Sequence, residues 1–354
     1  MSRLEEQTSD TEHNEETRKI QLTGKSTYIV SLPKKWVTNM NLKAGSQVVV
    51  SRQSDASLLL TPKELAKQTK LGDASFAISQ KDDADTIARK IVALYLVGYN
   101  VIAIKTKEER MTSLQRNLVK DFARRKLVGT EILSETPDEM KLQILLSYPE
   151  LSVENALRRM CLIAISMHED VIKALQTMDK ALAKEVIVLD DEVDRFSLYI
   201  IRQLKAAVQS EAALKNIGLF NQRDCLGYRV IVKSVERIAD HASKIAESVL
   251  ELDEKVDDSV LQKISEIDSF ARSVFDDATR SLHTKDYALA DSVVSKAKTI
   301  TAMENKAVRA FAKKGTRGIS TIRMIMESVR RTAEYASDIA EIVLNLNVDQ
   351  VIAT

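Results

Sequence analysis

The sequence predicts a mainly α-helical protein. A C-terminal pair of three-helix bundles is preceded by a small β-domain and a small α+β segment. The 354-residue chain has only 9 Gly and 4 Pro, where average usage would give about 25 and about 18, and long helices account for this shortage of turn formers. From Leu151 onward apolar residues recur at helical spacing with almost no Gly or Pro. Because one core rarely grows beyond about 250–300 residues, the length also indicates two or three domains.

The C-terminal half contains an internal duplication. The segments VERIADHASKIAESVL (235–250) and VRRTAEYASDIAEIVL (329–344) are identical at 10 of 16 positions. Each follows a helix with an acidic stretch, LDDEVDR (189–195) or MENKAVR (303–309), and each of those follows another long helix, at 153–177 or 260–282. This spacing is too long for solenoid units. It predicts two three-helix repeats, at 151–252 and 258–348, with six helices in all.

The first 150 residues read as two smaller modules. In residues 18–62 we expect strands at 19–22 and 27–32, a helix at 33–40, and a hairpin formed by 47–51 and 57–60. In the segment 74–147, called here the α+β segment, the pattern predicts the order βαβαββ. Its elements are expected at 74–79, 82–97, 100–105, 108–126, 130–133 and 140–147. The α+β segment carries no catalytic or phosphate-loop motif, so a structural spacer is favoured over small-molecule sensing.

Charge is distributed unevenly along the chain although the formal net charge is only +1. Residues 1–17 are acidic and read as a disordered tail. Residues 18–54 contain seven basic residues and no acid, which favours nucleic acid or another polyanion as a partner over a plain solvated surface.

Two pairs of carboxylates in the first repeat have the spacing of a metal site. Asp190 and Asp194 lie four residues apart, as do Glu236 and Asp240, so each pair lies on one helix face. If the two faces pack together, the four carboxylates, called here the first acidic set, need a cation. Oxygen ligands favour a divalent or trivalent metal ion, with Mg, Mn, Ca, Fe or Zn as candidates. The alternative is that these acids are solvated and pair with Arg195 and Arg237.

The second repeat departs from this pattern. Arg330 stands where the first repeat has Glu236, and Val308 stands where a second helix-two acid would be. The remaining acids, Glu304 and Glu334, form a degraded second acidic set. We expect an internal Arg–Glu pairing there, or a site for an anion, in place of a metal cluster.

Several protein classes are excluded by what the sequence lacks. The two Cys and four His show no CxxC or HxxxH spacing, and no GxSxG, P-loop or HExxH motif occurs. The sequence therefore predicts a protein that is not an enzyme, with metal-assisted phosphoester hydrolysis at the first acidic set as the alternative. The longest apolar run, 91–104, is too short to cross a bilayer and the N-terminus is polar, so a cytoplasmic location is expected.

Two resemblances to known families can now be stated. The stretches RKIQLTGKSTYIVSLPKKWV and NLKAGSQVVV resemble the swapped-hairpin SpoVT/AbrB domain. That resemblance implies a homodimer with interleaved strands that binds DNA. Its candidate DNA contacts are the basic residues Arg18, Lys19, Lys25, Lys34, Lys35 and Arg52. Trp36 is expected to be a core residue, with stacking on a base as the alternative.

The segments ERIADHASKIAE and LDDEVD resemble the helix-three and helix-two signatures of the PhoU family. The chain after residue 17 is similar to archaeal PhoU-type phosphate-uptake regulators with an N-terminal SpoVT/AbrB domain. The resemblance implies a DNA-binding transcriptional regulator of phosphate homeostasis that senses through a metal or a partner protein. Expected partners are DNA, a second copy of the chain, and a phosphate ABC-transporter ATPase or signalling proteins. The alternative is an adaptor that acts on a transporter or kinase without DNA.

Overall fold

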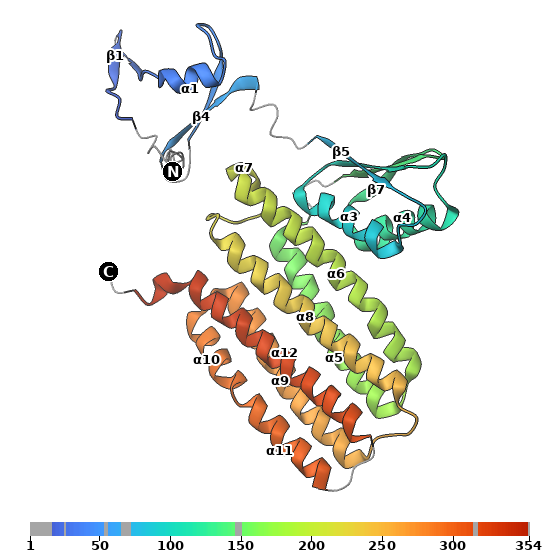
Figure 1. Cartoon of the computed structure of the whole chain (residues 1–354). Helices are drawn as coiled ribbons and strands as arrows, with labels where there is room; N and C mark the ends of the chain where they lie inside the picture. Colours follow the sequence, from blue (N-terminus) through green and yellow to red (C-terminus); the bar gives the residue numbers. More distant parts are fainter. Residues whose placement is uncertain are drawn as a thin grey trace, which may run out of the picture. The chain divides into compact units, whose positions relative to one another are not determined.

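The structure is a computed structural model that describes residues 16–24, 26–52, 56–64, 72–145, 151–313 and 318–352. The chain divides into two compact units, residues 1–70 and 71–354. Each unit is described by itself (Figure 1).

The N-terminal unit consists of two hairpins with a short helix between them. Its elements are β1 (Gln21–Thr23), β2 (Thr27–Ile29), α1 (Lys34–Asn39), β3 (Val48–Arg52) and β4 (Leu58–Pro62). β1 pairs antiparallel with β2, and β3 with β4. The order is the predicted one, but β2 ends at Ile29 instead of Leu32, because β1 is short and pairs with only three of its residues.

The N-terminal unit has almost no interior of its own. Among its described residues only Pro62 is buried, and Trp36 is half-buried, so the expectation of a core tryptophan is met only in part. One short helix and two small hairpins provide no second layer to cover the apolar side chains. Those left exposed are Ile20, Leu22, Tyr28, Ile29, Val30, Met40, Val49, Val50, Leu58 and Leu59.

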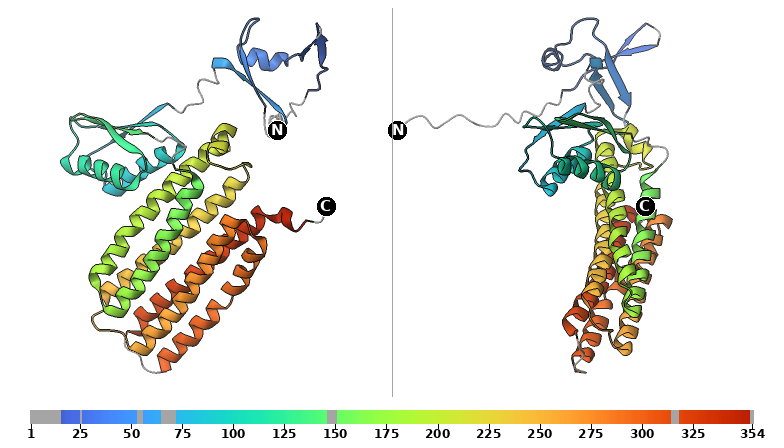
Figure 2. Two further views of the ribbon diagram at one scale, coloured as in Figure 1. Left: turned by 180° about the vertical axis from the view of Figure 1, so that it is seen from behind. Right: turned by 90° about the vertical axis from the view of Figure 1, so that its right-hand side faces the viewer.

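The α+β segment is a four-stranded sheet with two helices on one face (Figure 2). Its elements are β5 (Asp73–Ile78), α3 (Ala84–Val97), β6 (Val101–Thr106), α4 (Ser113–Lys126), β7 (Thr130–Glu135) and β8 (Glu139–Ile144). The sheet order is β5-β6-β8-β7, with β5 parallel to β6 and the other pairs antiparallel. The core lies between the helices and the sheet, where Ile91, Tyr95, Ile104 and Leu142 are fully buried.

Helix α4 begins five residues later than predicted. Thr112 and Gln115 form a capping box in which each side chain bonds the other residue's backbone N–H. This arrangement satisfies two of the free donors at a helix N-terminus and fixes the start of the helix at Ser113. The predicted start at residue 108 is therefore wrong, because apolar periodicity does not detect the cap.

The C-terminal part of this unit is an elongated helical bundle formed by the two repeats (Figures 1 and 2). The first repeat contains α5 (Val153–Thr177), α6 (Lys180–Gln209), α7 (Glu211–Asn216) and α8 (Asp224–Glu251). The second contains α9 (Asp258–Thr284), α10 (Tyr287–Ala297), α11 (Ile300–Lys313) and α12 (Ile319–Leu346), with a short 3-10 turn at Val348–Gln350. The two duplicated segments lie in α8 and α12, which pack against each other.

The expectation of six helices is corrected at two places. Ser210 is extended, and its side chain accepts from Ala213 N, so α7 starts as a separate short helix after α6. In the second repeat the helix-two region is divided into α10 and α11 around Thr299, whose hydroxyl donates to the Lys296 carbonyl. Both breaks are local hydrogen-bond effects of Ser and Thr.

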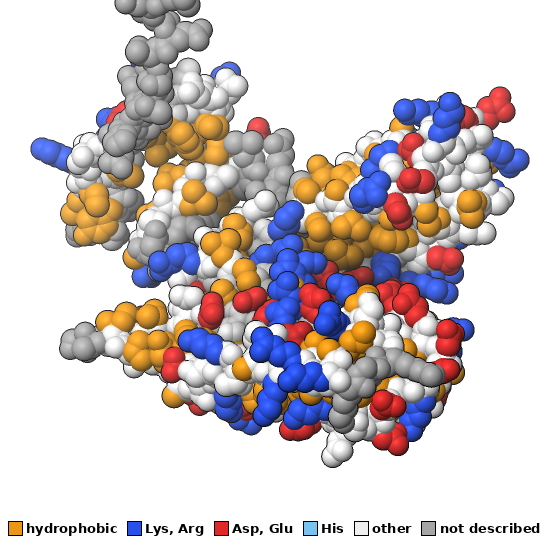
Figure 3. Space-filling view, turned by 60° about the horizontal axis from the view of Figure 1, so that its bottom comes forward, with side chains coloured by type: hydrophobic (Ala, Val, Ile, Leu, Met, Phe, Trp, Pro, Cys, Tyr) orange, Lys and Arg blue, Asp and Glu red, His pale blue; other side chains and the backbone are white. Residues whose placement is uncertain are grey.

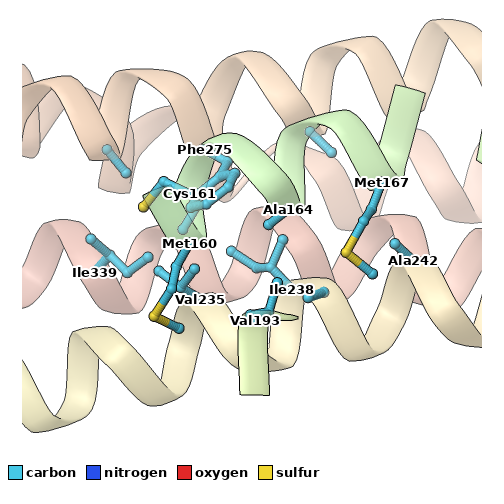
Figure 4. Packing of buried hydrophobic residues seen from close by; sticks show 14 of the residues in the cluster. Met160, Cys161, Ala164, Met167, Val193, Val235, Ile238, Ala242, Phe275 and Ile339 are labelled. Atoms are coloured by element: carbon cyan, nitrogen blue, oxygen red, sulfur yellow. The ribbon is translucent and has the colours of Figure 1, made fainter. Parts of the chain in front are cut away.

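One continuous core joins the two repeats. Figure 4 shows Met160 and Ala164 of α5 in the same buried layer as Phe275 of α9, Ile238 of α8 and Ile339 of α12. The interface between the repeats is therefore buried as fully as the interior of each repeat.

Candidate functional site

The first acidic set is brought together by the packing of α6 against α8. Burial raises the pKa of Asp190 to about 7, and the negative charges of Asp194 and Asp240 add to this effect. The pKa of Asp240 is also raised, first by burial and then by Glu236 and Asp194. Each of these carboxylates therefore feels the others, as the spacing of the residues predicted.

The first acidic set contains an unsatisfied oxygen. Asp190 Oδ1 is buried and has no hydrogen-bond partner, which is costly for a polar atom and suits the approach of a cation. Within the described ranges, however, no group of three or more His, Cys, Asp or Glu side chains stands close enough to hold a metal ion. The donor types fit an oxygen-bound metal, but the carboxylates are spread along the α6–α8 surface.

Side-chain cations draw two of these carboxylates apart. Lys126 at the end of α4 places its Nζ 2.6 Å from Asp191 Oδ1 and 3.0 Å from Asp194 Oδ2. On α8, Glu236 pairs with Lys233 and accepts a 2.9 Å hydrogen bond from Ser197 Oγ. Burial opposes the charge of Lys126, but its hydrogen bonds to the two aspartates outweigh burial and raise its pKa. Lys126 therefore remains an ammonium ion beside the first acidic set.

The arginines proposed as alternative partners point elsewhere. Arg195 pairs with Glu192 at 3.2 Å, and Arg237 lies over the ring of Tyr335. His241 stacks on the same ring, and its Nδ1 lies 3.2 Å from Ser328 Oγ on α12. Burial first, and then Lys244, lowers the pKa of His241 to about 4. This histidine belongs to the α8–α12 contact, as its rotation from Asp240 indicated.

The second acidic set is held by arginine. Arg330 Nε lies 2.7 Å from Glu304 Oε2, and the same guanidinium also pairs with Glu334. Arg331 adds a second contact to Glu334, at 3.1 Å. The structure thus has the internal Arg–Glu pairing that was expected where the duplicated motif lacks its acids.

The α+β segment is fastened to α6 at a second point. Arg202 is buried, lies over the Tyr95 ring at 4.9 Å and donates to the carbonyls of Tyr95 and Gly98 at the end of α3. Its guanidinium also donates to Asn100 Oδ1 at 3.0 Å. A cation at the C-terminus of a helix satisfies its free carbonyls and complements its dipole. Sequence analysis missed both Lys126 and Arg202, because their partners are distant in the chain.

The candidate DNA contacts lie on the surface of the N-terminal unit. Lys34 and Lys35 are exposed in the first turn of α1, and Arg52 is exposed at the end of β3. Lys19 is exposed as well, and Arg18, also exposed, pairs with Glu16. Lys25 lies outside the described residues. In the space-filling view the helical bundle shows basic and acidic side chains intermingled, whereas hydrophobic atoms gather on the N-terminal unit (Figure 3).

The comparison with known sequence families follows the two repeats. The family described as PhoU domain matches residues 157–258 and 264–343. The chain belongs to the PhoU family. Residues 21–68 match the family described as "Antidote-toxin recognition MazE, bacterial antitoxin", so the N-terminal unit is a MazE/AbrB-like domain.

Individual relatives agree with this family. The chain is 36% identical over 90 residues to the "Phosphate-specific transport system accessory protein PhoU homolog" of Borreliella burgdorferi. That match spans 25% of this chain and 39% of the length of the relative.

Among solved structures, the crystal structure of PhoU from Pseudomonas aeruginosa has a TM-score of 0.50 and 23% identity, covering 56% of this chain and 96% of that one. The structure of the phosphate transport system regulatory protein PhoU from Streptococcus pneumoniae has a TM-score of 0.48 and 18% identity, covering 57% and 96%. The Pseudomonas protein has the same fold as the two repeats.

No helix among the described residues is long and apolar enough to span a membrane. The PhoU-type repeats therefore carry the first acidic set on a bundle with a continuous hydrophobic core.

Proposed function

We propose that this protein is a homodimeric, DNA-binding transcriptional regulator of phosphate uptake, whose PhoU-type repeats sense through a metal ion or a partner protein. The observation that carries the proposal is the joining of a basic MazE/AbrB-like unit to a PhoU bundle in one chain. Neither module supplies both a DNA surface and a sensing bundle alone.

The dimer is supported by the apolar surface of the N-terminal unit. Ten large apolar side chains of this unit are exposed in the single chain, among them Tyr28 at 74% and Ile20 at 72%. Leaving so much apolar surface in water is unfavourable, at roughly 25 cal/mol per Å². A second copy that interleaves its hairpins would cover this surface.

DNA binding is supported by the basic residues of the same unit. Lys34 and Lys35 extend from one helical turn, and cations in such a position contact phosphates and release counterions. These contacts set the position of the protein on DNA and do not by themselves read its sequence.

Fluorescence anisotropy with labelled promoter DNA from the phosphate-transporter genes of the same genome tests DNA binding. The double variant K34E/K35E should bind at least about tenfold more weakly, and its salt dependence should fall by about 0.9 in log–log slope for each phosphate that the variant no longer neutralises. The matched control K263E, on α9 of the bundle, should bind like the unmodified protein. If K34E/K35E binds as tightly as the unmodified protein, the assignment of these lysines to the DNA interface is wrong.

A second part of the proposal is a metal ion at the first acidic set. Asp190, Asp194, Glu236 and Asp240 would hold it, with the unpartnered Oδ1 of Asp190 as one ligand atom. The ion would supply the positive charge that relieves the mutual repulsion of these carboxylates. Candidates are Mg, Mn, Ca, Fe and Zn, of which the hard ions suit oxygen ligands best.

Metal analysis of the purified protein tests this part. D190N/D240N should lose the bound metal that the unmodified protein retains through dialysis. D291N, at an exposed position on α10, should keep it. Equal metal content in D190N/D240N and the unmodified protein would remove the first acidic set as the site.

The adaptor role is the second candidate function. It is favoured by the match to a relative whose name describes a phosphate-specific transport system accessory protein. An adaptor would bind a transporter ATPase or a signalling kinase through the helical bundle, and K34E/K35E would then retain that binding.

A further inference from the structure

Lys126 connects two parts of the chain that no sequence pattern links. It is the last residue of α4 in the α+β segment, and its ammonium lies against Asp191 and Asp194 on α6. Asp194 is also a member of the first acidic set. We infer that Lys126 is a tethered cation that competes with a divalent metal ion for this set, so that metal binding releases α4 from α6. This inference rests on the metal site proposed above.

Competition follows from the sharing of Asp194. A metal ion bound by Asp194 would lie within a few ångströms of the Lys126 ammonium, and two cations at that distance repel each other strongly. The carboxylate cannot serve both partners at full strength. Because Asp194 now faces Lys126 at 3.0 Å, the set is open, which agrees with the lack of a closed ligand group within the described ranges.

Lys126 is able to leave. Its side chain is 25% exposed, so the ammonium has access to water, and a lysine stem has four rotatable carbons. Asp191, the other partner, is 43% exposed and stands outside the first acidic set. An ion pair with this exposure contributes little to stability and can be replaced by solvent.

The second fastening point does not share this property. Arg202 is buried and donates to the end of α3, with no acidic residue of the set among these partners. Metal binding would therefore free the α4 end of the α+β segment while the α3 end stays docked. Because the α+β segment follows directly after the DNA-binding unit in the chain, this release gives the metal site a route by which to influence that unit.

Titration calorimetry with Mn²⁺ on the EDTA-treated, full-length protein tests the inference. K126Q keeps most of the side-chain length and removes the charge, so it should bind Mn²⁺ at least about tenfold more tightly than the unmodified protein. K126R keeps the cation and should bind within about threefold of the unmodified protein. The matched control K120Q removes a lysine of the same helix that pairs with Glu135, at 2.7 Å, inside the α+β segment. It should leave the affinity unchanged.

Hydrogen–deuterium exchange provides an independent readout of release. Residues near the end of α4 should exchange faster in the unmodified protein when Mn²⁺ is added. In K126Q they should exchange fast already and respond little. Equal Mn²⁺ affinity in K126Q and the unmodified protein would overturn the competition while leaving the metal site intact. Absence of Mn²⁺ binding in both proteins would overturn the metal site and the competition together.

Discussion

At the scale of single residues, the least expected feature is the buried histidine at the junction of the repeats. His168 on α5 has no exposed surface, and its Nδ1 lies 3.2 Å from Asp268 Oδ1 on α9. Its Nε2 lies 3.1 Å from the Ile238 carbonyl, which can only accept, so this nitrogen carries a hydrogen. Arg272 holds the other Asp268 oxygen at 2.8 Å. Every polar atom of this group thus has a partner, which burial requires.

The duplicated positions on the other side of the interface are apolar. Helices α5 and α9 both end at a residue with positive φ, Met178 and Lys285. Aligning these two residues places Phe275 opposite His168 and Cys161 opposite Asp268. The two copies of the repeat therefore solve the same packing problem once with an ion pair and once with a hydrophobic pair.

H168F should destabilise the protein by about 3 kcal/mol, because it leaves Asp268 buried with one of its partners removed. H168F/D268C reproduces the Phe275–Cys161 pair and should recover more than half of that loss. Urea unfolding followed by circular dichroism gives both values. H283F, at a partly exposed histidine of α9, is the control and should change stability little. A double variant no more stable than H168F would show that the ion pair is not replaceable by its apolar counterpart.

At the scale of helices, the duplication explains how the two acidic sets diverged. The same face of α8 and α12 carries Glu236 in the first repeat and Arg330 in the second. In the first repeat the compensating cation, Lys126, arrives from another domain, whereas in the second Arg330 belongs to the motif itself. The second set is consequently closed by its own helix, and the first stays open to an external ion.

R330Q should destabilise the protein by about 1–2 kcal/mol, because it leaves Glu304 and Glu334 near each other without their shared cation. Burial already raises the pKa of Glu304, so the carboxylate form of this residue is the one that needs the guanidinium. Thermal unfolding at pH 7.5 measures the change. R323E, at an exposed position on the same helix, should alter stability by less than about 0.5 kcal/mol. Equal stability of R330Q and the unmodified protein would show that the pairing has no energetic weight.

At the scale of the whole molecule, the two units differ in how they are stabilised. The unit from residue 71 onward has two extensive buried clusters, one in the bundle and one in the α+β segment. The N-terminal unit buries one described residue and exposes many apolar ones. A small domain of this kind depends on association with another chain for its stability.

Light scattering coupled to size-exclusion chromatography should give the full chain a dimer mass, because only a second copy covers the apolar surface of the N-terminal unit. A fragment of residues 71–354, which retains both buried clusters, should elute as a monomer. A dimeric fragment would place the main dimer contact in the repeats instead.

Much of the fold could be predicted from local patterns. Helical periodicity located α5 at residues 153–177 and the duplicated helices α8 and α12, and the βαβαββ order of the α+β segment agrees with the structure. The errors fall where hydrogen bonds of single side chains override periodicity, as at the Thr112 cap of α4 and at Ser210. Apolar spacing reports which face of a helix is buried, and does not report where the helix stops.

The sequence by itself determined the helical class, the duplication and the two carboxylate pairs, because each of these depends on spacing within one helix. Only the tertiary structure decided which charges meet those carboxylates. Lys126 and Asp194 are 68 residues apart, and His168 and Asp268 are 100 apart. Contacts at such separations depend on how whole helices pack, and no local spacing encodes them.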